Sequence, residues 1–263
     1  SSPAEEVEEA RWKAAAVTES AWGFRTGFSD TDLPEREVSI APFPEIKGPV
    51  SELSPGRRGP VGHVGLIHRE VEDAPEGSVI LVDNLDSFTE NIAQSLAILG
   101  SDVLVMEGRP EVEGDPSETL NHWLDKIRPS RIVLGPGPAR PEASAITMEI
   151  ARRAVTGKLL VDSLAIPVLG LCLGHQALGL AAGWDLIKSP LGAVHGIPSM
   201  ITNDGSGLYS GMGRELVMMR YNSLVLEESN DYLIPNSWDE TGTLVMGLRH
   251  ESLPIHGIQF HPE

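Results

Sequence analysis

The chain has 263 residues, 41% of them hydrophobic, and its 38 acidic and 20 basic residues leave a formal net charge of −18 at pH 7. This acidic excess disfavours nucleic acid and anionic membranes as main partners, and no run of residues is long and apolar enough to span a bilayer. A single cysteine excludes an internal disulfide and fits a reducing cytoplasm. We therefore expect a cytoplasmic chain with one α/β domain and an appendage.

The first 77 residues differ in composition from the rest. Residues 4–16 are good helix formers, whereas residues 24–77 are rich in proline, glycine and charge. Such a composition predicts a short helix followed by an extended linker, with an edge strand around residues 61–67.

From Ser78 onward, strands and helices are expected to alternate. Short apolar runs typical of strands buried on both faces occur at residues 79–82, 103–105, 132–134 and 167–171. Helices are predicted between them, around residues 87–99, 115–127 and 143–155. Ser87 and Glu90 form a capping-box pair for the first of these helices, and Asp115–Pro116 opens the second.

This alternation is typical of the α/β class and predicts a doubly wound, mostly parallel sheet with flanking helices. Ligands of such sheets bind at the carboxyl ends of the strands. Beyond Trp184 the pattern changes to short strands, which predicts mixed or antiparallel pairing. These strands are expected at residues 216–219, 244–248 and 255–260.

The sharpest feature is a cysteine on the turn between a strand and a helix. Cys172 has a glycine two positions away on each side, Gly170 and Gly174. Glycines allow backbones to crowd at a tight turn, and a helix N-terminus stabilises a thiolate. The amide of Leu173 could face a developing oxyanion. A lone cysteine is more often a small buried hydrophobe, but this setting favours a nucleophile.

A thiol nucleophile needs a base, and the base needs an orienting partner. His261 follows an apolar strand, so it should also lie at a carboxyl end of the sheet, and Glu263 comes two residues later. A His-Pro-Glu turn alone is ordinarily a surface turn, but with Cys172 it completes a Cys-His-Glu set.

A loop of glycine and proline, residues 135–141, follows the third predicted strand. Such a loop can present rigid backbone amides to a substrate oxygen, which makes Gly137 a candidate oxyanion donor. Without the cysteine it would be read as an ordinary strand-to-helix loop.

Together these elements resemble the class I (triad) glutamine amidotransferases. Within them, the chain looks like the chorismate-linked branch, the glutaminase of anthranilate synthase, aminodeoxychorismate synthase and the phenazine-pathway enzyme. The matching stretches follow the family's order from Ser78 to the end, at residues 83–89, 135–141, 170–176, 195–196, 220–224 and 259–263.

The resemblance implies glutamine hydrolysis through a glutamyl thioester, which supplies ammonia for the amination of chorismate or isochorismate. Cys172 would attack the amide carbonyl, His261 would pass the thiol proton to the leaving ammonia, and Glu263 would orient His261. Gly137 and Leu173 would form the oxyanion hole.

The resemblance also implies the binding groups and partners. Gly137, Gln176 and the backbone of Ser223 and Leu224 would bind L-glutamine. Neither a metal nor an organic cofactor is implied for this half, whereas the chorismate-binding half of such enzymes uses Mg²⁺. A chorismate-utilising synthase domain or subunit, fused or separate, is the expected partner.

Two residues depart from the family pattern. Ala139 stands where the family usually has a second glycine, and Asn222 stands where it usually has histidine. Asn222 lies outside the triad, so we do not read it as inactivation. This variant looks closer to the fused phenazine-type and aminodeoxyisochorismate-type synthases than to stand-alone tryptophan-pathway subunits.

The resemblance also guides the expected domain boundaries. Residues 4–23 resemble the last helix of a chorismate-utilising synthase domain, although an unrelated leader fits them as well. We therefore divide the chain into residues 1–77, helix and linker, and residues 78–263, the glutaminase domain. Family members continue past the His-Pro-Glu turn, so we expect the natural chain to continue past Glu263.

Two other functions stay open. The first is another cysteine hydrolase of the same fold, such as a γ-glutamyl hydrolase or a peptidase; Gln176 and residues 223–224 favour glutamine only by resemblance. The second is a non-catalytic module that docks to a synthase, against which the intact Cys-His-Glu set argues. His175 and His195 do not form a metal cluster at ligand spacing; we place His175 in the helix after the cysteine and His195 in a turn.

Overall fold

The computed structural model describes residues 64–109, 114–228 and 232–262, all within one compact unit of the chain. The predicted N-terminal helix, most of the predicted linker and Glu263 lie outside the described residues. Of residues 1–77, the described part contributes β1 (Ile67–His68), a two-residue strand at one edge of the sheet, next to the predicted position.

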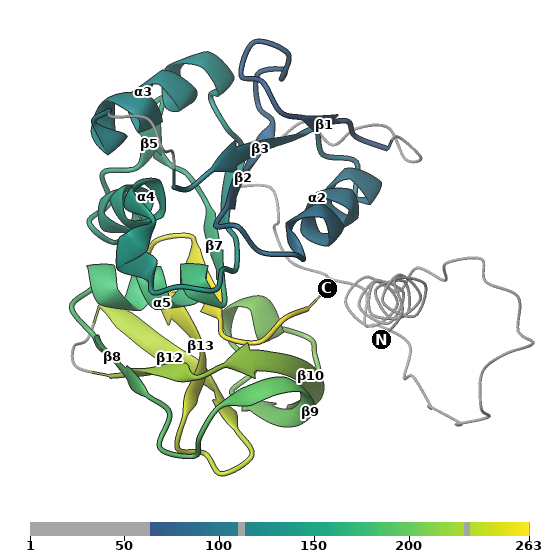
Figure 1. The fold of residues 1–263 in the computed structure, drawn as a ribbon, viewed down its shortest axis with the longest axis vertical. Helices are drawn as coiled ribbons and strands as arrows, with labels where there is room; N and C mark the ends of the chain where they lie inside the picture. The colour runs from purple at the N-terminus through teal and green to yellow at the C-terminus, as the bar shows by residue number, and fades with distance from the viewer. Residues whose placement is uncertain (1–63, 110–113, 229–231, 263) are drawn as a thin grey trace, which may run out of the picture. The chain divides into compact units, whose positions relative to one another are not determined.

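The remaining elements alternate as the sequence predicts in the first half and become strand-rich in the second (Figure 1). The helices are α2 (Thr89–Ile98), α3 (Pro116–Ile127), α4 (Ala145–Val155) and α5 (Leu173–Ala181), with short 3₁₀ turns η2 (Pro141–Ala143) and η3 (Gly207–Tyr209). The strands are β2 (Val79–Asp83), β3 (Val103–Glu107), β4 (Arg131–Leu134), β5 (Leu160–Val161), β6 (Leu164–Ala165), β7 (Val168–Leu171), β8 (Asp185–Lys188), β9 (Val194–Asn203), β10 (Glu215–Asn222), β11 (Leu224–Glu227), β12 (Leu233–Asp239), β13 (Val245–His250) and β14 (Ile255–Ile258).

Within the described ranges, ten strands form one sheet in the order β1-β3-β2-β4-β7-β14-β13-β12-β9-β10. Every pairing from β1 to β14 in this order is parallel, and every pairing from β14 to β10 is antiparallel. After β2 the chain crosses to β3 on one side and then returns to β4 on the other. The predicted α/β class and doubly wound sheet are confirmed, and this reversal is where such sheets bind ligands.

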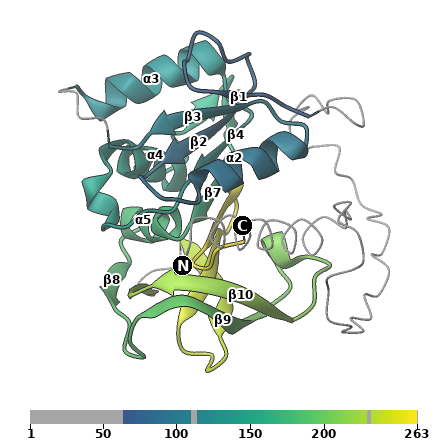
Figure 2. The same ribbon diagram turned by 45° about the vertical axis from the view of Figure 1, so that its right-hand side comes forward.

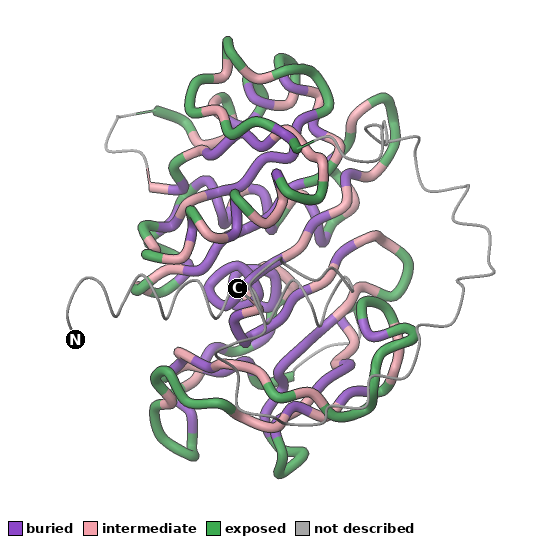
Figure 3. The backbone as a smooth tube through the Cα atoms, turned by 90° about the vertical axis from the view of Figure 1, so that its right-hand side faces the viewer, coloured by how far each residue is buried: buried purple, intermediate pink, exposed green. Residues whose placement is uncertain are grey.

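The sheet separates two apolar clusters, because successive strand residues face opposite sides. Ile80 and Val82 join the cluster that contains buried residues of α3, α4 and α5. Val79 and Leu81 join the cluster that contains buried residues of α2. Accordingly, α3 and α4 lie on one side of the parallel strands and α2 on the other (Figure 1). Buried residues are concentrated in the central strands (Figure 3), and most residues of α5 are buried as well.

The helix starts are only partly as predicted. α3 begins after Asp115, whose carboxylate accepts a hydrogen bond of 2.9 Å from the amide of Ser117, as the sequence indicates. The predicted capping box of α2 is wrong, since the N-cap is Phe88 and makes no side-chain cap hydrogen bond. Instead, Asp83 at the end of β2 accepts the hydroxyl of Thr89 at 2.7 Å, so the strand itself fixes the start of the helix.

The antiparallel half confirms the strands predicted after Trp184 and adds two long ones, β9 and β12. Placing His195 in a turn is wrong, because it lies in β9. This strand could not be recognised in the sequence because it contains Gly196 and Pro198, and both residue types weaken strands. The fold tolerates Pro198 because β12 pairs with β9 only at residues 201–203, which leaves that side of Pro198 unpaired.

Candidate active site

The candidate site lies where four neighbouring parallel strands end. β2, β4 and β7 are consecutive in the sheet (Figure 2), and β14 follows β7 in the strand order. The residues that directly follow them are Asn84, Gly135, Cys172 and Gln259. Chain segments far apart in the sequence therefore bring these four positions to one edge of the sheet.

Cys172 occupies a strained turn between β7 and α5. Its backbone has φ 49° and ψ −98°, a conformation that costs a non-glycine residue roughly 1–3 kcal/mol. A Cβ on Gly170 would lie 2.5 Å from the carbonyl carbon of Gly174, and one on Gly174 would lie 2.2 Å from the oxygen of Leu134. Both glycines are therefore required by close backbone approach, and the predicted turn is confirmed.

The sulfur of Cys172 accepts a hydrogen bond from the side chain of Gln259. The Nε2–Sγ distance is 3.4 Å, and Cys172 is only 6% exposed. The other end of the same amide, Oε1 of Gln259, accepts from Nε2 of Gln176 at 3.0 Å. Gln259 was not singled out by the sequence, although it lies in the matching stretch of residues 259–263.

Gln176 and Leu224, both expected to bind glutamine, are in direct contact. Nε2 of Gln176 donates to the carbonyl oxygen of Leu224 at 3.3 Å, and Nδ2 of Asn222 donates to the same oxygen at 3.0 Å. Oδ1 of Asn222 accepts from Nε of Arg220 at 3.2 Å. Burial lowers the pKa of the Arg220 guanidinium, against the opposing charge of Asp239. Asn222 thus helps to fix the carbonyl oxygen of Leu224, to which Gln176 also donates.

The structure also places Ser223, another predicted glutamine contact, directly before Leu224. It lies between β10 and β11, and its carbonyl oxygen accepts the amide of Ser189 at 2.9 Å.

The segment that carries His261 leaves the sheet at the same edge as the turn that carries Cys172. Leu171, directly before Cys172, is the register partner of Ile258, three residues before His261. The backbone amide of His261 donates to the oxygen of Met219 at 2.9 Å, which ties this segment to β10. Glu263, the predicted orienting residue, lies outside the described residues.

Aromatic rings surround His261. The ring centroids of Tyr221 and Phe88 lie 5.0 Å and 5.6 Å from that of His261, both edge-on. His195 contacts Tyr221 in turn, at 5.5 Å. Sequence reasoning missed this cluster because its members come from four separate matching stretches, and only His261 was assigned a role.

The two predicted oxyanion donors are brought together. A Cβ on Gly137 would lie 2.9 Å from Cδ1 of Leu173 and 2.7 Å from the oxygen of Asn84, so the loop packs tightly on the turn. Asn84 is fully buried and donates Nδ2 to the oxygen of Gly135 at 2.9 Å. Its Oδ1 accepts the hydroxyl of Thr147 at 2.8 Å. Asn84 therefore anchors the loop, a role that the sequence did not reveal.

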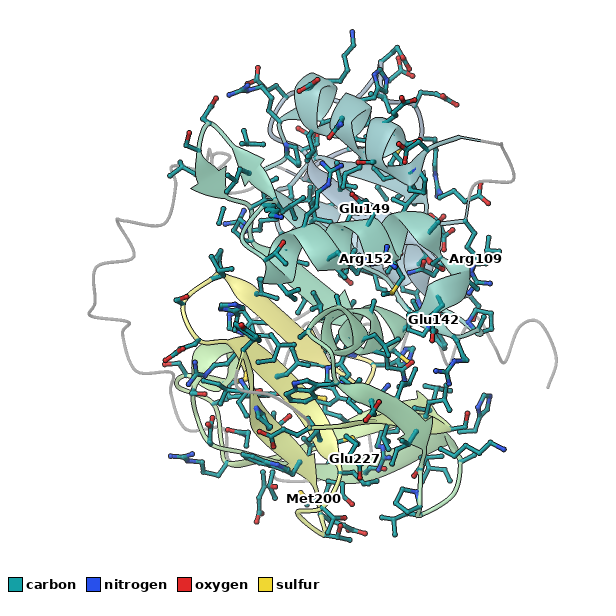
Figure 4. All side chains as sticks on the ribbon, turned by 90° about the vertical axis from the view of Figure 1, so that its left-hand side faces the viewer. Arg109, Glu142, Glu149, Arg152, Met200 and Glu227 are labelled. Carbon is teal, nitrogen blue, oxygen red and sulfur yellow. The ribbon has the colours of Figure 1, made fainter. Side chains whose placement is uncertain are left out.

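A surface hollow of about 560 Å³ lies elsewhere, against α3 and α4. Glu149 and Arg152 line it, and Figure 4 shows them on α4. Arg153 in the same hollow already donates to Glu149, Asn121 and Ser117. Cys172 does not line this hollow, so we place the candidate site at the edge of the sheet with Cys172. Among the residues that the structure describes, no three His, Cys, Asp or Glu side chains gather as metal ligands would. None of the helices in the described ranges has the length and apolar character needed to cross a membrane.

Comparison with known proteins gives a consistent result. The family model of the class-I glutamine amidotransferases matches residues 80–263. Aminodeoxychorismate synthase component 2 from Escherichia coli (strain K12) is 36% identical over 190 residues, which cover 70% of this chain and 90% of that protein. Anthranilate synthase component 2 from Thermus thermophilus is 36% identical over 188 residues, covering 70% of this chain and 83% of that one. The crystal structure of a glutamine amidotransferase from Thermotoga maritima aligns with a TM-score of 0.52 at 14% identity, over 70% of this chain and 75% of that one, which supports the fold alone.

Proposed function

We propose that this chain, which belongs to the class-I glutamine amidotransferase family, hydrolyses L-glutamine to glutamate and ammonia through a thioester on Cys172. The observation that carries this proposal is the position of Cys172 on the strained turn at the N-terminus of α5, with an amide donor on its sulfur. Such a turn holds the sulfur at the carboxyl edge of the sheet, beside the unpaired amides of the helix.

Each step of the reaction has a proposed residue. The thiolate of Cys172 attacks the side-chain amide carbon of glutamine, and His261 takes the thiol proton and returns it to the leaving ammonia. The amides of Gly137 and Leu173 stabilise the oxyanion, which their tight packing supports. Water then cleaves the thioester, with His261 as base, and releases glutamate. Glu263 orients His261.

The amino-acid end of glutamine is proposed to lie beside Gln176. Both hydrogens of that amide are used, on Leu224 and on Gln259, so only Oε1 of Gln176 remains for substrate. An amide oxygen is an acceptor, which suits the α-ammonium group of glutamine. The backbones of Gly137, Ser223 and Leu224 are proposed to complete the binding site.

The acceptor of the ammonia is proposed to be chorismate or isochorismate. The relatives named as component 2 of aminodeoxychorismate and anthranilate synthases support this class of acceptor. We propose that a chorismate-utilising synthase domain or subunit, which binds Mg²⁺, is the partner, and that the pair works in the cytoplasm. Asn222 and Ala139 support a synthase of the phenazine type.

Replacement of the nucleophile tests the proposal. We expect Cys172→Ala to reduce ammonia release from glutamine by at least about a thousandfold, because both covalent steps are lost. The assay measures ammonia and glutamate with the synthase partner and acceptor present. Circular dichroism checks that the variant keeps its fold, which a small side chain on the turn should allow.

Two controls separate the alternatives. A glutamine-mimicking diazoketone should label the wild-type chain once, at Cys172, and leave Cys172→Ala unlabelled in the mass spectrum. Cleavage of γ-glutamyl peptides in place of glutamine would identify a γ-glutamyl hydrolase. Substantial ammonia release by Cys172→Ala, or an unlabelled and inactive wild type, would contradict the proposal.

A further inference from the structure

We infer that Gln259 is a further catalytic residue, whose side-chain amide donates to the sulfur of Cys172 and stabilises its thiolate. This inference deepens the proposed function and rests on Cys172 as the nucleophile. The predicted Cys-His-Glu set would then have a fourth member, Gln259, which is neutral and donates a hydrogen bond to the reacting sulfur. The contact that carries it is the 3.4 Å hydrogen bond from Nε2 of Gln259 to Sγ.

The direction of this hydrogen bond is fixed by a chain of contacts that begins at a backbone carbonyl. The oxygen of Leu224 can only accept, so Gln176 must present its NH₂ group there. That same NH₂ group also faces Gln259, which must therefore present its oxygen. The remaining end of the Gln259 amide is then the NH₂ group, and it faces the sulfur of Cys172. Flipping either amide would set two donors or two acceptors against each other.

A donor aimed at the sulfur favours one protonation state. A thiol sulfur is a weak acceptor, whereas a thiolate is a strong one, because a hydrogen bond to an ionised group is roughly twice as strong as a neutral one. Gln259 is fully buried, and its backbone amide donates to the oxygen of Met246 at 2.9 Å. The contact is therefore held in place away from bulk water, where such a hydrogen bond is stronger.

The same contacts join the nucleophile to the proposed glutamine site. Gln176 is one hydrogen bond from Gln259, and Asn222 reaches Gln176 through the oxygen they share. The residue that would receive the amino-acid end of the substrate thus also orients the donor on the sulfur.

The pH dependence of alkylation tests this inference without using glutaminase activity. The chain has one cysteine, so the rate of its modification by iodoacetamide reports on a single sulfur. Gln259→Met keeps the length of the side chain and removes the donor. We expect the midpoint of its alkylation profile to rise by about one pH unit, which is about tenfold slower alkylation below the midpoint. Gln259→Glu places an anion at the sulfur and should shift the midpoint further.

Matched substitutions at an exposed glutamine control for general effects. Gln94 lies on the exposed face of α2, and Gln94→Met and Gln94→Glu make the same chemical changes there. Their alkylation profiles should coincide with that of the wild type. Coincident midpoints for Gln259→Met and the wild type, with both proteins folded by near-ultraviolet circular dichroism, would overturn the inference.

A measurement on the unmutated side chain covers the case in which both Gln259 variants unfold. In ¹⁵N-labelled protein, the side-chain amide signal of Gln259 should shift as the thiol ionises, with the midpoint found by alkylation. This titration should be absent in Cys172→Ser. A Gln259 signal that stays constant across the midpoint overturns the inference. A wild type that shows the shift but releases no ammonia would instead contradict the proposed function.

Discussion

Thr147 and Asn84 show how one buried hydroxyl can support the candidate site. Thr147 is fully buried, and its hydroxyl donates to Oδ1 of Asn84. Thr147→Val keeps the shape of the side chain and leaves that oxygen without a donor. We expect the free energy of unfolding to fall by about 1–3 kcal/mol, measured by urea denaturation, because a buried acceptor loses its partner. Thr119→Val is the control, since the Thr119 hydroxyl makes no hydrogen bond to the described residues; an equal loss in both variants would contradict this role.

Some roles in the candidate site could be predicted from the sequence and others could not. Cys172 could be predicted because its two glycines mark a turn that has a local cause. The family likeness behind that prediction is confirmed by the match over residues 80–263. The roles of Asn84 and Gln259 could not be predicted, because they depend on β2 lying beside β4 and β14 beside β7. Strand order is not a property of any one stretch of sequence.

At the scale of elements, the turn between β7 and α5 has little room for a larger side chain. A Cβ on Gly174 would meet both the backbone oxygen of Leu134, at 2.2 Å, and its Cβ, at 2.6 Å, and a backbone in the centre of a sheet cannot move away. We therefore expect Gly174→Ala to lower the free energy of unfolding by about 3 kcal/mol or to prevent folding. Gly213→Ala is the control, because the nearest atom to its new Cβ would be 3.6 Å away. Thermal denaturation compares them, and equal melting temperatures would refute the packing argument.

The elements were predictable where one local pattern decides them. Strands β2, β3, β4 and β7 are buried on both faces and read as apolar runs, and Asp115 marks the start of α3. The prediction of an element was wrong where a contact with a distant residue determines its start or its pairing. Ser87 and Glu90 fit a capping box, but Asp83 on the neighbouring strand makes the contact that fixes α2. β9 was missed because its tolerance for Pro198 depends on where β12 stops pairing.

At the scale of the whole molecule, buried histidines make stability depend on pH. Burial lowers the pKa of His175, which is fully buried, from 6.5 to about 3, and it also lowers the pKa of His256 and of His250. Between these values the unfolded chain binds a proton at His175 and the folded chain does not. Stability is therefore complete above pH 6.5 and falls as the pH drops from there toward about 3.

The expected loss is large enough to measure. For His175 alone, unfolding at pH 5.5 should require about 1.4 kcal/mol less than at pH 7.5, by linkage to its pKa shift from 6.5 to about 3. Urea denaturation at both pH values tests this, in 0.5 M salt to screen the repulsion of a chain with net charge −18. His175→Asn should be less stable overall but less sensitive to pH, because the group that titrates only on unfolding is gone. His122→Asn, on the exposed face of α3, should keep the full pH dependence. If His175→Asn loses as much stability between the two pH values as the wild type does, the buried imidazole is not the cause.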